Sequence, residues 1–84
     1  MNTQKLSNIS LKTFRIFLIK IGCVKVNIQK GRGGHEKWIK EGLTRPIVLQ
    51  THIDPIPEFI VKNTLQNLGI SKSEYFRIMK PKPD

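Results

Sequence analysis

The chain has 84 residues, enough for one small domain and too few for two catalytic domains. Hydrophobic residues make up 38% of it, so the hydrophobic core can only be modest. Fifteen lysines and arginines against six acidic residues give a net charge of +9, which favours a polyanionic partner such as nucleic acid, an acidic protein or a membrane surface.

The sequence gives no sign of a membrane span, a signal peptide or a disulfide. The apolar-rich stretch 14–24 is interrupted by Arg15 and Lys20 and is too short to span a membrane. Residues 1–6 lack the organisation of a signal peptide. The single cysteine, Cys23, excludes an internal disulfide and a cysteine-based zinc site. We therefore expect a cytoplasmic protein with no membrane partner.

The first predicted element is an amphipathic helix. Ser10 suits its N-cap, and Gly22 suits the left-handed residue that follows its last turn. Between them, apolar residues recur at three- and four-residue spacing: Leu11, Phe14, Leu18 and Ile21. This spacing is typical of a helix that buries one face.

Three strands are predicted next. Residues 24–28 alternate between apolar and polar side chains, as in a half-buried strand, and a basic glycine-rich loop follows at 29–34. The second strand is predicted at 35–40 and the third at 45–50. Pro46 lacks an amide hydrogen, so it indicates an edge strand or the first residue of a strand.

The second strand separates its side chains into two faces. His35 and Lys37 alternate with Glu36 and Trp38, so each pair belongs to one side of the sheet. Trp38 is the only tryptophan, and we expect it to pack in the core rather than to stack on a nucleic-acid base.

Two further helices complete the chain. Pro57 suits the first turn of the helix that runs to Gly69, and residues 51–57 before it are expected to be irregular. The run Ser71-x-x-Glu74 is a capping box, which predicts a short helix over 72–79.

The predicted fold class is α+β, in the order α-β-β-β-α with an extra short C-terminal helix. Three antiparallel strands with helices on one face form a stable two-layer domain. We expect a single domain over 1–84, with 1–9 and 80–84 as candidate flexible tails. The same element order occurs in double-stranded-RNA-binding domains.

The loop before His35 is the first candidate for chemistry. Gly31, Gly33 and Gly34 let the backbone approach a phosphate closely, while Lys30 and Arg32 supply positive charge. The spacing is not that of a P-loop, so a plain hairpin connection stays an open interpretation.

His35 and His52 are the candidate proton carriers, because histidine changes charge near neutral pH. Cleavage of RNA needs a base for the 2′-hydroxyl and an acid for the leaving oxygen. Pairing of strands two and three would place residue 35 across from about residue 50, beside His52. The two histidines would then serve as acid and base, as metal ligands or in neither role. Together with Asp54 they do not define a metal site, and none is assigned.

Several short motifs, in this order and spacing, resemble one family over residues 10–78: Lys30-x-x-x-Gly34-His35-Glu36-Lys37-Trp38, Arg45-Pro46-x-Val48, His52, Pro57 and Asn63-Thr64-Leu65-x-x-Leu68-Gly69-Ile70-Ser71. That family is the HicA group of bacterial mRNA-interferase toxins. The resemblance implies a dsRBD-like fold, cleavage of mRNA, and inhibition by a HicB-like antitoxin. DNA would be bound only indirectly, through the antitoxin.

The resemblance also implies a catalytic role for His35, which lies where the family has its histidine. Our hypothesis is metal-independent cleavage without a cofactor, with His52 as a possible second acid or base. RNA and phosphate would be held by residues around the histidine: Lys30, Arg32, Gly33, Gly34, Lys37 and Arg45.

Two alternatives remain open. The chain has Gly34 where the family typically has serine or aspartate, and glycine has no side chain to hydrogen-bond the histidine. This departure favours a non-catalytic RNA-binding module of the dsRBD type. The second alternative is an interaction domain whose basic surface only docks an acidic protein.

Overall fold

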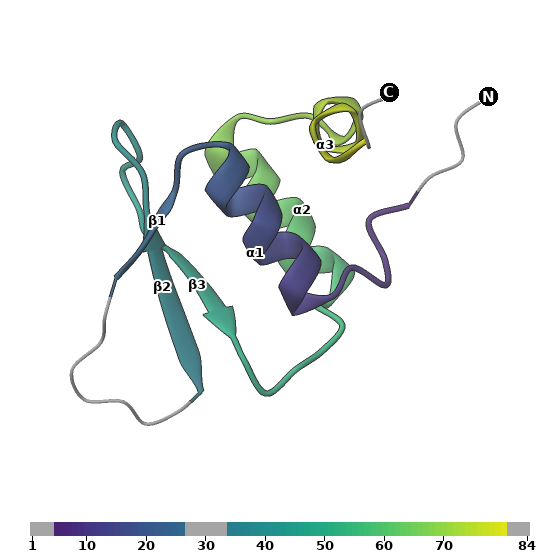
Figure 1. The fold of residues 1–84 in the computed structure, drawn as a ribbon, viewed down its shortest axis with the longest axis horizontal. Helices are drawn as coiled ribbons and strands as arrows, with labels where there is room; N and C mark the ends of the chain where they lie inside the picture. The colour runs from purple at the N-terminus through teal and green to yellow at the C-terminus, as the bar shows by residue number, and fades with distance from the viewer. Residues whose placement is uncertain (1–4, 27–33, 81–84) are drawn as a thin grey trace.

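The computed structural model describes residues 5–26 and 34–80 of the chain (Figure 1). The elements in chain order are α1 (Leu11–Lys20), β1 (Val24–Val26), β2 (His35–Ile39), β3 (Ile47–Gln50), α2 (Glu58–Leu68) and α3 (Lys72–Met79). This is the predicted α+β order with the additional C-terminal helix. Figure 1 shows α1 and α2 on the same side of the sheet, with α3 on the far side of them.

The sheet is antiparallel with the strand order β1-β2-β3. In its register Val26 lies opposite Lys37, and His35 lies opposite Gln50. Among the described strands β3 pairs with β2 alone and forms an edge, and Pro46 immediately precedes it. Both interpretations of Pro46, an edge strand and a strand start, are consistent with this position.

β1 does not bury its valines as the alternation predicted: Val24 and Lys25 are exposed, and Val26 is only partly buried. Val24 is 60% exposed on the uncovered face of the sheet, whereas Cys23 is buried. Lys25 lies opposite Trp38, on the helix-covered face, and its ammonium comes within 3.8 Å of the Glu36 carboxylate. The alternation of apolar and polar residues in β1 did not predict that Lys25 would lie on the helix-covered face, near the Glu36 carboxylate.

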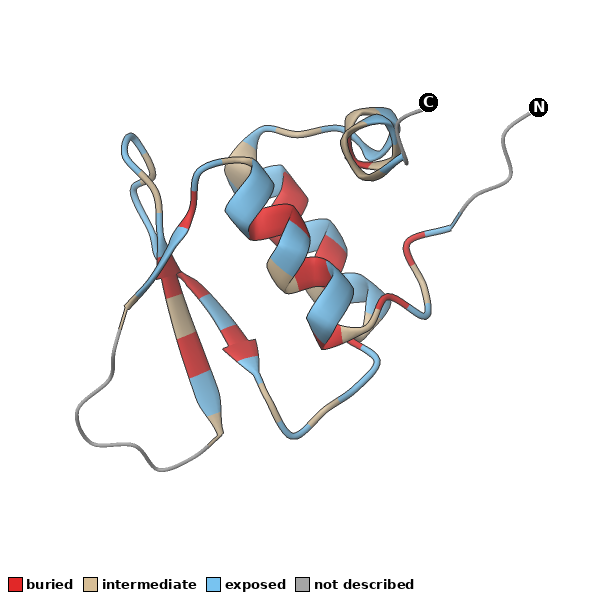
Figure 2. Ribbon diagram, in the orientation of Figure 1, coloured by how far each residue is buried: buried red, intermediate tan, exposed pale blue. Residues whose placement is uncertain are grey.

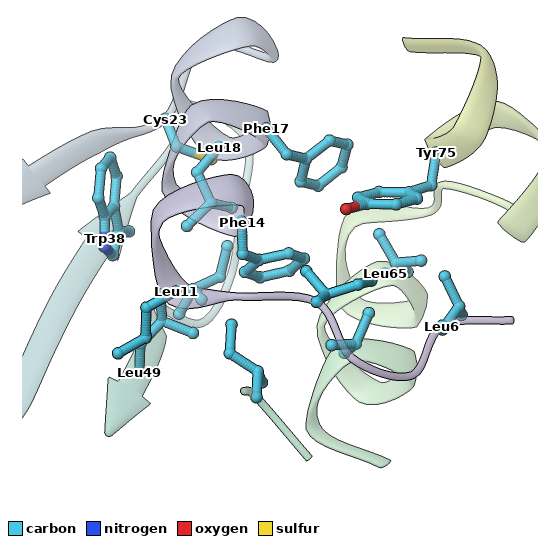
Figure 3. Close-up of a cluster of buried hydrophobic side chains, with 14 residues drawn as sticks. Leu6, Leu11, Phe14, Phe17, Leu18, Cys23, Trp38, Leu49, Leu65 and Tyr75 are labelled. Carbon is cyan, nitrogen blue, oxygen red and sulfur yellow. The ribbon is translucent and has the colours of Figure 1, made fainter. Parts of the chain in front are cut away.

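The core fills the space between the sheet and the helices. Figure 3 shows Phe14 and Phe17 of α1 near Tyr75 of α3, with Trp38 and Leu49 contributed by the sheet. The rings of Phe17 and Tyr75 meet edge to face, with centroids 4.7 Å apart. Figure 2 marks buried residues along α1, and these are Leu11, Phe14, Phe17 and Leu18.

Residues 5–9, before α1, pack against this core, so the described part of the candidate flexible tail over 1–9 is not a free tail. Leu6 is 3% exposed and Ile9 is 7% exposed, and Ile9 pairs with Ile56 in an isolated β-bridge. Two apolar residues three positions apart gave too little periodicity to predict this packing. Residues 1–4 and 81–84 lie outside the described ranges.

Helix ends follow the predicted local signals. The Ser10 hydroxyl accepts a hydrogen bond from the Thr13 amide at the start of α1. Gly69 ends α2 in the left-handed conformation, at a φ of 72°, which glycine adopts at little cost. Ser71 and Glu74 form the reciprocal capping box of α3.

Candidate functional site

His35 begins β2 and is exposed. Its strand partner is Gln50, the last residue of β3. Beyond this pair the Thr51 amide donates to the Gly34 carbonyl at 2.9 Å, so pairing continues past the end of the strand. The backbone on both sides of His35 is therefore fixed to β3, while the side chain remains accessible.

Lys37 lies two residues further along β2 and faces the same side of the sheet. Its strand partners are Val26 on one side and Val48 on the other. Exposed apolar side chains share this uncovered face: Val24, Ile39 and Val48. The face thus combines one imidazole and one ammonium with apolar surface.

The predicted phosphate loop lies mostly outside the described residues. This applies to Lys30, Arg32 and Gly33, whose position relative to His35 stays a prediction. Gly34 is described, and its carbonyl accepts the Thr51 hydrogen bond. No side-chain hydrogen bond from position 34 can orient the imidazole, as the sequence indicated.

Arg45 does not lie beside His35, which corrects the predicted cluster. It belongs to the connection between β2 and β3, whereas His35 is at the opposite end of this hairpin. The four-residue step from His35 to Ile39 alone spans about 13 Å along the strand. Arg45 instead lines a hollow of about 170 Å³ together with Lys37 and Lys40.

His52 is exposed and lies two residues after Gln50, so it is at the same end of the sheet as His35. The loop that carries it is anchored at several points. The Ile53 amide donates to the Gln50 carbonyl at 3.4 Å, and the Asp54 carboxylate accepts from the Leu11 amide at 3.1 Å. The Asp54 carboxylate therefore binds the backbone at the start of α1, and we do not assign it to a ligand site with His35 and His52.

Within the ranges 5–26 and 34–80, no group of three histidine, cysteine or acidic side chains is arranged to hold a metal ion. In the same ranges, no helix is long and apolar enough to cross a membrane.

The opposite face of β2 carries a buried ionic cluster around Glu36. The Arg15 guanidinium donates to both carboxylate oxygens, with Nε 3.1 Å from Oε1. The Trp38 indole also donates to Oε1, at 3.1 Å. Trp38 is 3% exposed, which confirms that it packs in the core. Sequence reasoning missed this cluster, because Arg15 lies among the polar residues of its helix.

Electrostatics keep this carboxylate ionised. Burial by itself would raise the pKa of Glu36, but hydrogen bonds from Arg15 and Trp38, with the charges of Arg15 and Lys25, lower that pKa overall. The hydrogen bond to Glu36 raises the pKa of Arg15 in return. The pair therefore ties α1 to β2, the strand that presents His35 and Lys37.

No protein-family model, curated protein or solved structure matches this chain.

Proposed function

We propose that this chain is the toxin of a toxin–antitoxin pair and cleaves mRNA, with His35 as the general base. The observation that carries the proposal is the exposed position of His35 at the end of the sheet, fixed through Gly34 and Gln50, with Lys37 on the same face. A fixed backbone under an accessible imidazole suits proton transfer to a bound substrate.

In this mechanism His35 removes the proton of an RNA 2′-hydroxyl, and the 2′-oxygen attacks the adjacent phosphorus. The bond to the 5′-oxygen breaks, which leaves a 2′,3′-cyclic phosphate and a 5′-hydroxyl. The leaving oxygen takes a proton, and His52, at the same end of the sheet, is the candidate donor. Lys37 stabilises the negative charge that develops on the phosphate.

The RNA backbone would continue from His35 along the uncovered face. Lys37 lies two residues from His35 on β2 and also lines the hollow that contains Lys40 and Arg45. We assign Lys40 and Arg45 to a phosphate away from the cleaved linkage. Arg45 keeps its predicted role in RNA binding, at a different place from the one expected.

Regulation is proposed from the resemblance to the HicA family together with the charge. A HicB-like antitoxin with an acidic surface would cover the face that binds RNA, and would be attracted by the net charge of +9. DNA would be contacted by the antitoxin. The substrate and the resemblance favour a cytoplasmic location.

The direct test compares RNA cleavage by the wild type and by His35→Ala in EDTA, with Lys12→Ala, an exposed change on α1, as the control. We expect His35→Ala to lower the cleavage rate by about 10²–10⁴-fold, the usual contribution of one acid or base. His52→Ala should reduce the rate less, and Lys12→Ala should not change it. Equal cleavage by the wild type and His35→Ala would remove His35 from the mechanism.

The integrity of the bound RNA distinguishes a ribonuclease from a non-catalytic RNA-binding module. RNA that is bound by the wild type but stays intact would contradict the ribonuclease proposal and favour the non-catalytic module of dsRBD type. Loss of wild-type cleavage in EDTA would instead indicate a metal-dependent reaction.

A further inference from the structure

A cavity of about 300 Å³ adjoins His35. Its walls come from β3, from the loop after it and from the start of α2, and they are mainly apolar: Val48, Leu49, Ile53, Ile56, Pro57 and Ile60. Two polar residues, His35 and Gln50, complete the lining on the side of the sheet. The volume is at the lower end of the range of small-molecule sites, roughly 300–1,000 Å³.

Phe59 contributes an aromatic ring to this cavity and is 63% exposed. It is the second residue of α2, whose buried residues are Val61, Thr64 and Leu65. The ring therefore adds little to the core and presents a large apolar surface at the cavity. Exposed aromatic rings of this kind are the usual platforms for unpaired bases.

We propose that this cavity binds one base of single-stranded RNA, stacked on Phe59 and adjacent to His35. The inference rests on the proposed function, because it assigns a subsite to the same RNA. Gln50, which offers both hydrogen-bond donors and an acceptor, contacts the polar edge of the base. Since the base is joined directly to its ribose, the sugar of this nucleotide is kept near His35.

Charge favours this occupant over a neutral apolar molecule. A nucleotide in the cavity carries its phosphate outward, toward the face that presents His35 and Lys37. Glu58, next to Phe59, forms an ion pair with Lys62 at 3.4 Å, which offsets its repulsion of the phosphate. The net charge of +9 attracts the polyanion as a whole.

The test measures binding rather than cleavage. The probe is a short single-stranded oligonucleotide in which every 2′-hydroxyl is replaced by a methoxy group, so that the 2′-oxygen cannot attack. Phe59→Ala should weaken its binding by about 5- to 150-fold, the effect of one lost base–aromatic stack. Phe59→Trp should restore binding. Ile19→Ala, at an equally exposed apolar residue on α1, should leave it unchanged.

An abasic oligonucleotide with the same phosphates identifies the cause. Phe59→Ala should bind it as well as the wild type does, because no base is left to stack. Equal loss on both oligonucleotides, or no loss on either, would overturn the proposed base site. If the wild type binds and Phe59→Ala behaves as expected but RNA is never cleaved, the base site stands and the ribonuclease proposal fails.

Discussion

Glu36 holds α1 against the middle of the sheet. Its side chain is 8% exposed and receives hydrogen bonds from Arg15 and Trp38. Arg15→Ala would remove two of these contacts and leave the carboxylate buried with fewer partners. We expect a loss of about 1–3 kcal/mol in the free energy of unfolding, measured by urea denaturation.

Lys62→Ala is the matched control for Arg15→Ala, since it removes the cation of an exposed ion pair with Glu58. Exposed pairs contribute only about 0–1 kcal/mol. A loss for Arg15→Ala no larger than that for Lys62→Ala would show that the buried cluster adds little stability. Trp38 fluorescence reports unfolding directly, because its ring is buried in the native protein.

The same carboxylate predicts how stability depends on pH. Because the pKa of Glu36 is lowered in the folded protein, its contribution is complete above the ordinary value of 4.5 and is lost as pH falls through the lowered pKa. The wild type should therefore lose stability below about pH 4.5. Glu36→Gln cannot titrate, so it should lose less stability over the same range, although it is less stable at neutral pH.

Glu74 also has a lowered pKa, chiefly because its carboxylate accepts a hydrogen bond from the Ser71 amide. It contributes to the acid dependence of both the wild type and Glu36→Gln, so the difference between the two isolates Glu36. If the wild type and Glu36→Gln lost the same stability between neutral and acidic pH, in chemical or thermal unfolding, Glu36 would not be the source of the acid dependence.

The sequence predicted which residues share a face of β2 but not which of them form contacts. Alternation placed Glu36 and Trp38 together on one side, as the structure has them. Arg15 lies 21 residues away on another element, and only the fold brings its guanidinium to Glu36. Phe59 was likewise missed. Its signal was a large aromatic side chain that is not among the buried residues of α2, which are Val61, Thr64 and Leu65.

The capping box of α3 is a local device with a measurable effect. The Ser71 hydroxyl accepts from the Glu74 amide at 3.1 Å, and the Glu74 carboxylate accepts from the Ser71 amide at 3.0 Å. α3 in turn carries Tyr75 into the core. Ser71→Ala should lower the free energy of unfolding by about 0.5–2 kcal/mol.

Ser73→Ala provides the control within α3, because Ser73 is exposed and is not the N-cap. Ser73→Ala should leave the free energy of unfolding unchanged or raise it slightly, because alanine has the higher helix propensity. Equal effects of Ser71→Ala and Ser73→Ala in urea denaturation would mean that α3 does not depend on its cap.

Element types and ends were largely predictable because they depend on neighbours in the chain. Serine caps, Gly69 and Pro46 each act within a few residues of their own position. The orientation of β1 was not predictable from its own alternation, because it follows from the register with β2, in which Lys25 lies opposite Trp38. Arg45 was placed wrongly because it was grouped with His35 for its positive charge. In the β2–β3 hairpin, Arg45 lies at the connection and His35 lies at the open end.

The positive charge of the whole molecule predicts salt-sensitive binding of RNA. Each phosphate neutralised contributes a slope of about −0.7 to log K against log salt for a single strand. Lys37→Ala should reduce the slope by about that amount, and so should Arg45→Ala. Lys12→Ala removes the same charge from an exposed lysine of α1 and serves as the control. Unchanged slopes for both Lys37→Ala and Arg45→Ala would exclude the uncovered face as the RNA site.

In the proposed reaction the RNA's own 2′-hydroxyl is the nucleophile, activated by His35. One oligoribonucleotide, cleaved by the wild type at a mapped linkage, is compared with the same strand carrying a single 2′-deoxynucleotide on the 5′ side of that linkage. We predict that the deoxy linkage resists cleavage and that the unmodified products end in a 2′,3′-cyclic phosphate. Equal cleavage of the deoxy linkage, or products that end in a 3′-hydroxyl, would contradict this mechanism.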